Sequence, residues 1–253
     1  MASIEIENDF FQCRQENDCA LITTKEGAKG IFTTVGLKEE MIATLKAIED
    51  LPDIKGIALI YSSQYQGDAE YKLFFQKVLE DRSVDGQDRA SMRFRTAVIQ
   101  FYKIIIKYPK PIVVGMNGNI GPDSLGLSLV CDVRIATEKA NFMNPNIHMG
   151  FPPSALLSFF LVQSLGSVRA TELMLTKTKF SPHEALDLGL ITQLASEEDI
   201  ENTCIGKLKE LSELPSHAII ETRNLFHSDV SVIEKHLDKF SKSSIRSLYK
   251  MQS

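Results

Sequence analysis

The sequence predicts an α/β fold with a parallel sheet at its centre, and three observations support this. Two apolar runs, Ile54–Tyr61 and Pro111–Val114, hardly alternate with polar residues, which is typical of strands buried on both faces. Amphipathic segments with helical spacing lie between such runs. A chain of 253 residues with 43% hydrophobic residues is long enough to bury a sizeable core. Repetition of strand, helix and strand favours right-handed crossovers between parallel strands.

Composition and charge exclude several classes of protein. The net charge of −5 comes from 28 basic and 33 acidic residues spread along the chain, which argues against a nucleic-acid-binding protein. There is no apolar run of about 18 residues that would predict a membrane span. The N-terminal segment is acidic and lacks the apolar core of a signal peptide. We therefore expect a cytoplasmic protein that binds neither membranes nor nucleic acid.

The four cysteines predict free thiols rather than a metal site or a disulfide framework. They are scattered along the chain and form neither a CxxC pair nor a pair with histidine at ligand spacing. The cysteines are Cys13, Cys19, Cys131 and Cys204.

The first sixty residues predict a hairpin, a helix and a strand. Phe10–Arg14 and Cys19–Thr24 are short β-rich runs joined by a polar turn. Leu37–Asp50 has apolar residues at helical spacing with charges between them, and Pro52 ends this helix. Ile54–Tyr61 then forms a buried strand.

The middle of the chain predicts a long helical region and a strand–turn–helix unit. A polar segment separates two amphipathic stretches that we expect to be helices. After the strand that follows them, the continuous apolar run gives way to apolar residues at helical spacing. The predicted elements are helices at Tyr71–Glu80 and Phe94–Lys107, a strand at Pro111–Val114, a turn at Asn117–Pro122, a helix from Ser124 and a strand at Val133–Ala136.

The last hundred residues are predominantly helical. A helix at Leu156–Leu165 ends at Gly166, because glycine commonly terminates helices. Further helices at Ser167–Thr176 and Pro182–Leu188 precede a short strand at Ile191–Leu194. After this strand the composition is polar and helical, with breaks at Pro215 and near Asp229.

Several motifs stand in an order and spacing found in one family. Lys110-Pro111, Asn117-Gly118 and the run from Cys131-Asp132 to Ala136 follow one another without a gap. The match continues through Ala140–Phe142, Pro145, Met149-Gly150 and Phe180–Ile191. In these motifs the chain resembles the crotonases, the enoyl-CoA hydratase/isomerase superfamily, over about residues 1 to 250.

The resemblance implies a spiral of ββα repeats with a C-terminal helical module. Residues 1–195 would form the spiral core with an acyl-thioester site. Residues 196–253 would form a helical trimerisation module, giving a homotrimer or a hexamer made of two trimers.

The resemblance also implies an oxyanion hole made of two backbone N–H groups that hold a thioester carbonyl oxygen. In the loop Ser62–Glu70 the amide of Ala69 would be one donor, and a backbone donor tolerates changes of side chain. The second would be the amide of Asp123, at the start of the helix after the turn. The alternative for the loop is that it is only a polar surface turn. For Asp123, the alternatives are that its carboxylate caps the helix amides or that it acts as an acid or base.

The usual acids of the family are missing. Its hydratases use two glutamates, and the matching positions here are Gly126 and Asn146, so a paired-carboxylate device for hydration is absent. Candidate replacements within the matched segments are Asp68, Glu70, Asp123 and His148. His148 is a conceivable base because histidine titrates near neutral pH, on a segment expected to be extended. A structural role for His148 is the alternative.

The expected contacts with coenzyme A come from two loops. Lys25 and Lys29 occupy a loop where family members carry basic residues near the CoA phosphates, and ammonium groups can pair with a diphosphate. Gly67 and Ala69 of the oxyanion loop complete the expected set. Solvent-exposed lysines without a ligand are the alternative for Lys25 and Lys29.

Together these features lead to two hypotheses. The first is an enzyme of the hydratase/isomerase group that acts on an acyl-CoA or acyl-carrier-protein thioester by stabilising an enolate, with non-standard acid/base residues. The second is a catalytically inactive relative that binds a thioester or a protein partner. In both, no cofactor is bound permanently, and coenzyme A enters as part of the substrate.

Overall fold

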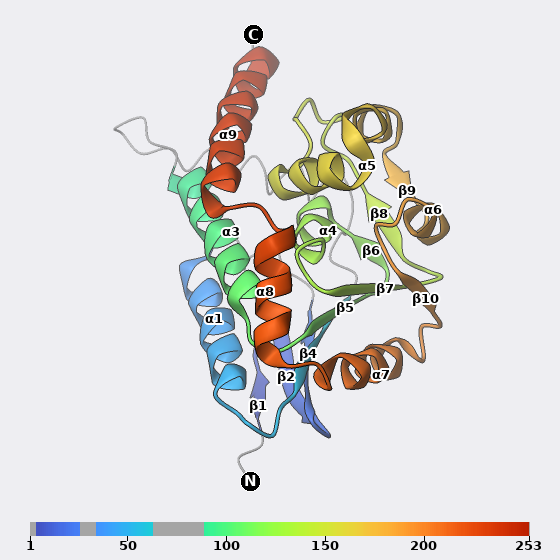
Figure 1. Ribbon diagram of the computed structural model, residues 1–253. Helices are drawn as coiled ribbons and strands as arrows, with labels where there is room; N and C mark the ends of the chain where they lie inside the picture. Colours follow the sequence, from blue (N-terminus) through green and yellow to red (C-terminus); the bar gives the residue numbers. More distant parts are fainter. Residues whose placement is uncertain (1–3, 26–33, 63–88, 253) are drawn as a thin grey trace.

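The computed structural model describes residues 4–25, 34–62 and 89–252 of the chain (Figure 1). Its central sheet has seven strands in the order β1-β2-β3-β4-β5-β7-β10. These are β1 Glu5–Glu7, β2 Phe11–Glu16, β3 Cys19–Thr24, β4 Gly56–Tyr61, β5 Ile112–Met116, β7 Val133–Thr137 and β10 Gln193–Ala195. A smaller sheet has the order β6-β8-β9, from β6 Asn119–Ile120, β8 Asn141–Met143 and β9 Lys179–Phe180. The prediction of an α/β fold is confirmed.

The strand pairing places several strand ends at one edge of the central sheet. Strands β1, β2 and β3 pair antiparallel, whereas β3, β4, β5, β7 and β10 run parallel to one another. In this register Tyr61 pairs with Met116, and Met116 pairs with Ala136. The carboxyl ends of β4, β5 and β7 therefore lie side by side.

Helices cover both faces of this sheet. They are α1 Val35–Glu49, α3 Arg89–Lys107, α4 Pro122–Ser128, α5 Ala155–Thr176, α6 Pro182–Asp187, α7 Ile200–Ser212, α8 Ser216–Phe226 and α9 Val230–Gln252. In Figure 1, α1, α3 and α8 stand beside one another, while α7 lies on the other side of the strands from α1. The structure therefore has two apolar layers, one on each side of the central sheet.

Alternation along the strands explains how both faces become apolar. Ala20 and Ile22 of β3 belong to the large core that includes α1 and α3. Cys19 and Leu21, which alternate with them along the strand, pack into a second cluster with Cys204 of α7. Successive side chains of a strand point to opposite faces, so a continuous apolar run serves two layers.

Helix α7 approaches the sheet closely because two strand positions carry glycine. A Cβ at Gly56 would lie 2.7 Å from Cδ2 of Leu208, and one at Gly115 would lie 2.9 Å from Sγ of Cys204. Real Cβ atoms are not found at such distances, so a side chain at either position would force the Leu208 or Cys204 side chain to move. Helix α7, at the start of the predicted C-terminal module, thus packs directly on the core.

Most predicted elements appear, with shifts of a few residues at their ends. The predicted break at Gly166 is confirmed, because Gly166 has a non-helical φ of +74° and divides α5 into the two expected helical parts. Four short strands, β1, β6, β8 and β9, have no counterpart in the prediction. The helix predicted at Tyr71–Glu80 lies outside the described residues.

Candidate functional site

The predicted site lies where β4 and β5 end. The chain leaves β4 through Ser62, whose Oγ donates to the backbone oxygen of Thr24 and whose N–H donates to Thr24 Oγ1 at 3.3 Å. Strand β5 is followed by Asn117, whose N–H donates to the Tyr61 oxygen at 2.9 Å. In parallel α/β sheets ligands bind beyond the carboxyl ends of the strands, so this edge is the natural place for a site.

Most of the predicted oxyanion loop lies outside the part of the chain that the structure describes. Gly67, Asp68, Ala69 and Glu70 lie outside the described residues, as does Lys29. Their roles as donor, acid, base or CoA contact stay predictions.

Lys25 is described, and its ammonium group already has partners. Its Nζ forms an ion pair with Oε1 of Glu7 at 2.7 Å and donates to the Asn8 oxygen at 2.8 Å. These contacts attach the end of β3 to the β1–β2 turn. A phosphate at Lys25 would compete with the Glu7 carboxylate.

Asp123 is the second residue of the short helix α4, whose N-cap is Gly121. Its backbone N–H belongs to the first turn, where amides have no acceptor within their own helix. Its carboxylate Oδ1 accepts a hydrogen bond from Oγ of Ser154, the buried N-cap residue of α5. The side chain therefore connects the starts of two helices, α4 and α5.

Gly126 has no room for any side chain. A Cβ built there would lie 2.5 Å from the backbone nitrogen of Leu157 and 2.9 Å from Cβ of Leu156. Both residues belong to the first turn of α5, so the backbone of α5 fills the space that a larger residue would need. The position that the resemblance matches to a hydratase glutamate therefore has no space for such a side chain.

Asn146 is fully buried, with 0% of its surface exposed. Its Nδ2 donates to the Pro152 oxygen at 3.0 Å, while its Oδ1 has no hydrogen-bond partner among the described residues. Its backbone oxygen accepts from the N–H of Phe151 at 2.8 Å. In this conformation the amide closes the 146–151 turn and faces protein rather than open space.

His148 lies on a turn, so the expectation of an extended segment is wrong. Residues 146–150 form this turn, closed by the N–H of Met149 donating to Pro145 at 3.2 Å and that of Gly150 donating to Ile147 at 3.0 Å. Gly150 has φ of +81°, which favours glycine and turns the chain back toward α5. The His148 side chain is exposed to solvent.

A second polar contact at the start of α5 has no signal in the sequence. Ser158 Oγ lies 2.9 Å from Nε2 of His236 on α9, and the Phe159 ring contacts the same imidazole edge-on with centroids 5.2 Å apart. Burial lowers the pKa of His236 below its ordinary value. Its partner is 78 residues away in the chain, so only the folded structure brings the two together.

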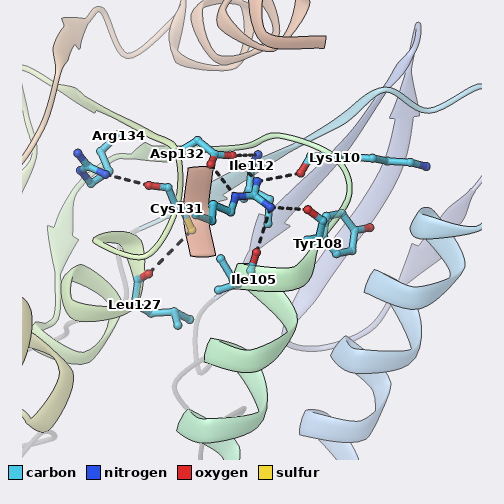
Figure 2. A network of polar contacts seen from close by, with 9 residues as sticks. Ile105, Tyr108, Lys110, Ile112, Leu127, Cys131, Asp132 and Arg134 are labelled. Atoms are coloured by element: carbon cyan, nitrogen blue, oxygen red, sulfur yellow. Dashed lines mark hydrogen bonds and ion pairs between the residues drawn. The ribbon is translucent and has the colours of Figure 1, made fainter. Parts of the chain in front are cut away.

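The Cys131-Asp132 motif has a structural role, which Figure 2 shows. The Asp132 carboxylate accepts from Nε of Arg223 at 2.8 Å, from Nη2 at 2.5 Å and from the Ile112 N–H at 2.7 Å. Arg223 comes from α8 and is only 3% exposed. The pair joins α8 to the amino ends of β5 and β7, away from the predicted thioester site.

The cysteine prediction agrees with the structure. All four thiols are free and buried. Burial raises the pKa of Cys13 to about 11 and that of Cys131 and Cys204 to about 12. Protonated thiols are poor nucleophiles and poor metal ligands. Among the described residues, no group of three or more His, Cys, Asp or Glu side chains is placed to hold a metal ion.

The part of the chain that the structure describes contains no helix with the length and apolar character needed to cross a membrane.

Comparison with known proteins identifies a group of relatives. Residues 20–252 match the family model for enoyl-CoA hydratase/isomerase. Enoyl-CoA delta isomerase 2 of Rattus norvegicus is 28% identical over 144 residues, which cover 57% of this chain and 37% of the relative. 4-chlorobenzoyl coenzyme A dehalogenase-1 of Arthrobacter sp is 27% identical over 142 residues, covering 55% of this chain and 51% of that protein. The chain thus matches about half or less of the length of these two curated relatives.

A solved structure supports the same fold. Enoyl-CoA hydratase from Bacillus halodurans superposes with a TM-score of 0.75 and 22% sequence identity, and the match covers 94% of each chain. At this level of identity the similarity concerns the fold alone. The expected crotonase fold is confirmed.

Proposed function

Because the chain belongs to the enoyl-CoA hydratase/isomerase family, we propose that it acts on an acyl-CoA or acyl-carrier-protein thioester. The proposed chemistry is of lyase or isomerase type and passes through an enolate. The thioester oxygen accepts hydrogen bonds from the amides of Ala69 and Asp123 as negative charge develops on it. Coenzyme A belongs to the substrate in this proposal, and no resident cofactor takes part.

The observation that carries the proposal is the position of α4. Its N-terminus follows the carboxyl end of β5 after a short segment that contains β6, inside the region that the family model covers. The partial positive charge of a helix N-terminus favours an oxyanion. Ser154 fixes the Asp123 side chain toward α5, which leaves the carboxylate with a role in supporting the start of α4.

The proposed acid and base differ from the family's glutamate pair. Gly126 has no side chain and no room for one, and Asn146 is buried and cannot exchange a proton. Asp123 already accepts a hydrogen bond from Ser154, and His148 points to solvent from its turn. We therefore favour Asp68 or Glu70 of the oxyanion loop for proton transfer.

Hydrogen exchange at the acyl α-carbon tests this mechanism whatever product the reaction forms. The protein is incubated with a panel of acyl-CoAs in D₂O, and deuterium uptake is followed by mass spectrometry beside a crotonyl-CoA hydration assay and a CoA-binding titration. Enolate formation predicts uptake for at least one thioester. Asp68→Asn or Glu70→Gln should abolish uptake if that residue is the base.

A pair of variants at position 123 separates the amide from the carboxylate. Asp123→Ala removes the contact with Ser154 but keeps the backbone N–H, whereas Asp123→Pro removes both. Proline is tolerated in the first turn of a helix. Loss of one oxyanion donor costs about 10²- to 10³-fold in rate, so Asp123→Pro should be slower than Asp123→Ala by about this factor. Equal rates for the two variants would exclude the Asp123 amide as a donor.

A second candidate function is favoured by the closed acid positions. With Gly126 packed against α5 and Asn146 fully buried, the site has lost both groups that hydration requires. An inactive relative that binds a thioester or a protein partner fits this observation. It predicts saturable binding of an acyl-CoA with no deuterium uptake for any thioester, while absence of binding would exclude both candidates as thioester proteins.

We also propose that the chain assembles as a homotrimer or a hexamer in the cytoplasm. Val168 and Leu175 of α5 are 80% and 58% exposed, and a subunit contact on this helix would remove them from water. Sedimentation equilibrium tests the assembly, because a trimer or hexamer has three or six times the chain mass of 28.3 kDa. A single species of that chain mass would contradict it.

A further inference from the structure

A groove of about 510 Å³ lies on the opposite edge of the sheet from the proposed thioester site. Pro111 and Asp132, which precede β5 and β7, are part of its wall, whereas the thioester site follows the carboxyl ends of the strands. Helix α8 and the end of α7 supply most of the remaining wall, and Leu129, Cys131 and Arg134 complete it. A volume in this range is typical of sites for small molecules.

The wall of the groove is mostly apolar. Leu211 and Leu214 come from the end of α7 and its following turn, and Ile219 and Phe226 come from α8. Leu214 and Phe226 are 51% and 80% exposed, so apolar surface at this edge remains in contact with water. A ligand with a hydrocarbon part would remove this surface from water, which is favourable at about 25 cal/mol per Å².

One cation in the groove, Arg134, forms no ion pair with a described carboxylate, although Asp132 interacts with it electrostatically from a longer distance. Arg134 donates from Nε to the Leu190 oxygen at 2.8 Å and from Nη1 to the Cys131 oxygen at 2.9 Å. Its Nη2 makes no hydrogen bond with any described residue, and no described carboxylate lies within ion-pair distance. Arg134 is half-buried and lines the groove, so its remaining N–H groups are the candidate donors to an anion.

The charges of the lining residues leave a net positive groove. Asp132 is the sole carboxylate among them, and its oxygens accept from the Arg223 guanidinium and the Ile112 N–H. The pair Asp132–Arg223 is therefore neutral as a unit. Burial lowers the pKa of His227, which keeps its imidazole neutral at pH 7. With Asp132 counted against Arg223, Arg134 leaves the lining residues with one net positive charge, in a chain whose net charge is −5.

We propose that this groove is a second binding site, for a small apolar carboxylate. Its carboxylate pairs with the guanidinium of Arg134, and its hydrocarbon part lies against Leu211 and Ile219. The ligand class follows from the combination of one unpaired cation with an apolar wall of small-molecule size. The proposal does not depend on the thioester chemistry, because the two sites use different edges of the sheet.

Calorimetric titration of the full chain with octanoate tests the site. Octanoate has the required charge and apolar chain, octanamide lacks the charge, and acetate lacks the chain. We expect saturable binding of octanoate, with octanamide and acetate at least tenfold weaker. An excess of acyl-CoA should not displace octanoate, because the thioester binds elsewhere.

Two exposed positions on α8 provide a matched pair of variants. Thr222 lines the groove and Asn224 does not, yet both side chains are exposed, so neither substitution should disturb folding. Thr222→Phe fills the groove and should raise the octanoate Kd at least tenfold, while Asn224→Phe should leave it within twofold. Arg134→Gln removes the charge and should reduce octanoate affinity to that of octanamide.

The outcomes that overturn the proposal are distinct. Absence of saturable octanoate binding, including the case in which a second copy of the chain covers α8, would exclude the site. Equal affinity for octanoate and octanamide would exclude Arg134 as the anion partner. If Arg134→Gln fails to fold because it loses contacts with Leu190 and Cys131, an unchanged Kd in Thr222→Phe still refutes the proposal.

Discussion

Arg223 is buried, and each of its N–H donors has an acceptor. An arginine side chain carries five such donors. Nε and one Nη2 hydrogen go to Asp132, the other Nη2 hydrogen goes to the Lys110 oxygen at 3.0 Å, and Nη1 donates to the oxygens of Ile105 and Tyr108. The three carbonyls belong to the end of α3 and the segment before β5 (Figure 2). One side chain therefore binds segments from three parts of the chain.

We expect Arg223→Met to destabilise the protein by about 3–5 kcal/mol, because it leaves the Asp132 carboxylate without its partner. Urea denaturation measures the change in the free energy of unfolding. Arg223→Lys keeps the charge but cannot reach both carboxylate oxygens and three carbonyls, so it should also be clearly destabilised. Arg246→Met, at an exposed position of α9, is the control and should change stability by less than about 0.5 kcal/mol. A similar small effect at Arg223 would refute the structural role.

At the scale of elements, the contact of α4 with α5 determines which residues can stand at position 126. The backbone of α5 lies against Gly126, and Ser154 at the start of α5 binds Asp123 near the start of α4. The two helices thus touch along most of the length of α4. The packing of α4 against α5 therefore requires glycine at position 126.

We expect Gly126→Ala to destabilise the protein by about 1–3 kcal/mol, because the new methyl group collides with backbone that cannot rotate away. Gly206→Ala in α7 is the matched control. A Cβ at Gly206 meets nothing within 4 Å, so alanine should stabilise this helix by about 0.5–1 kcal/mol. Thermal and urea unfolding of both variants measure the difference. Equal effects of the same sign at the two positions would contradict the packing described for α4.

The regular elements could be predicted from local sequence, but several small ones could not. In a long strand or helix the spacing of apolar residues indicates the type of element. This spacing made β3, β4, α1 and α3 recognisable from the sequence. Strands β8 and β9 have three and two residues, and their pairing places Phe142 on Phe180 with ring centroids 5.2 Å apart. A partner 38 positions away leaves no periodic signal in either segment.

The site was predictable only in part, for the same reason. The motifs placed Asp123 at the start of a helix, and the structure agrees. That the Asp123 carboxylate meets Ser154 depends on how α4 and α5 cross, which no local pattern encodes. The turn that exposes His148 depends on hydrogen bonds within residues 145–151 and on the positive φ of Gly150, so a strand-like alternation was the wrong expectation.

At the scale of the molecule, the C-terminal quarter completes the core. Helix α7 covers the face of the sheet formed by Leu21, Ala58 and Val113, and α9 contributes Ile233 and Leu237 to the core on the other side. Helix α8 adds the Arg223 network. The segment after residue 195 is therefore part of the packing that holds the sheet, whatever assembly it also supports.

We expect a chain truncated after residue 195 to be insoluble or unfolded, because it exposes the apolar face that α7 covers. A chain truncated after residue 229 keeps α7, α8 and Arg223 and loses only α9. It should remain soluble, with reduced stability. Soluble yield, far-ultraviolet circular dichroism and urea unfolding distinguish the two. A stable, cooperatively folding 1–195 fragment would show that the first part is an independent domain.

The Arg223–Asp132 pair also has a consequence for biosynthesis. The two residues are 91 positions apart, so a growing chain on the ribosome contains the Asp132 carboxylate long before α8 has been made. Until then that acid has no guanidinium from α8 beside it, and for most of this time the sheet also lacks α7 on its second face. The fold can therefore be completed only after α7 and α8 have left the ribosome. Nascent chains stalled before α8 should be the form that chaperones recognise.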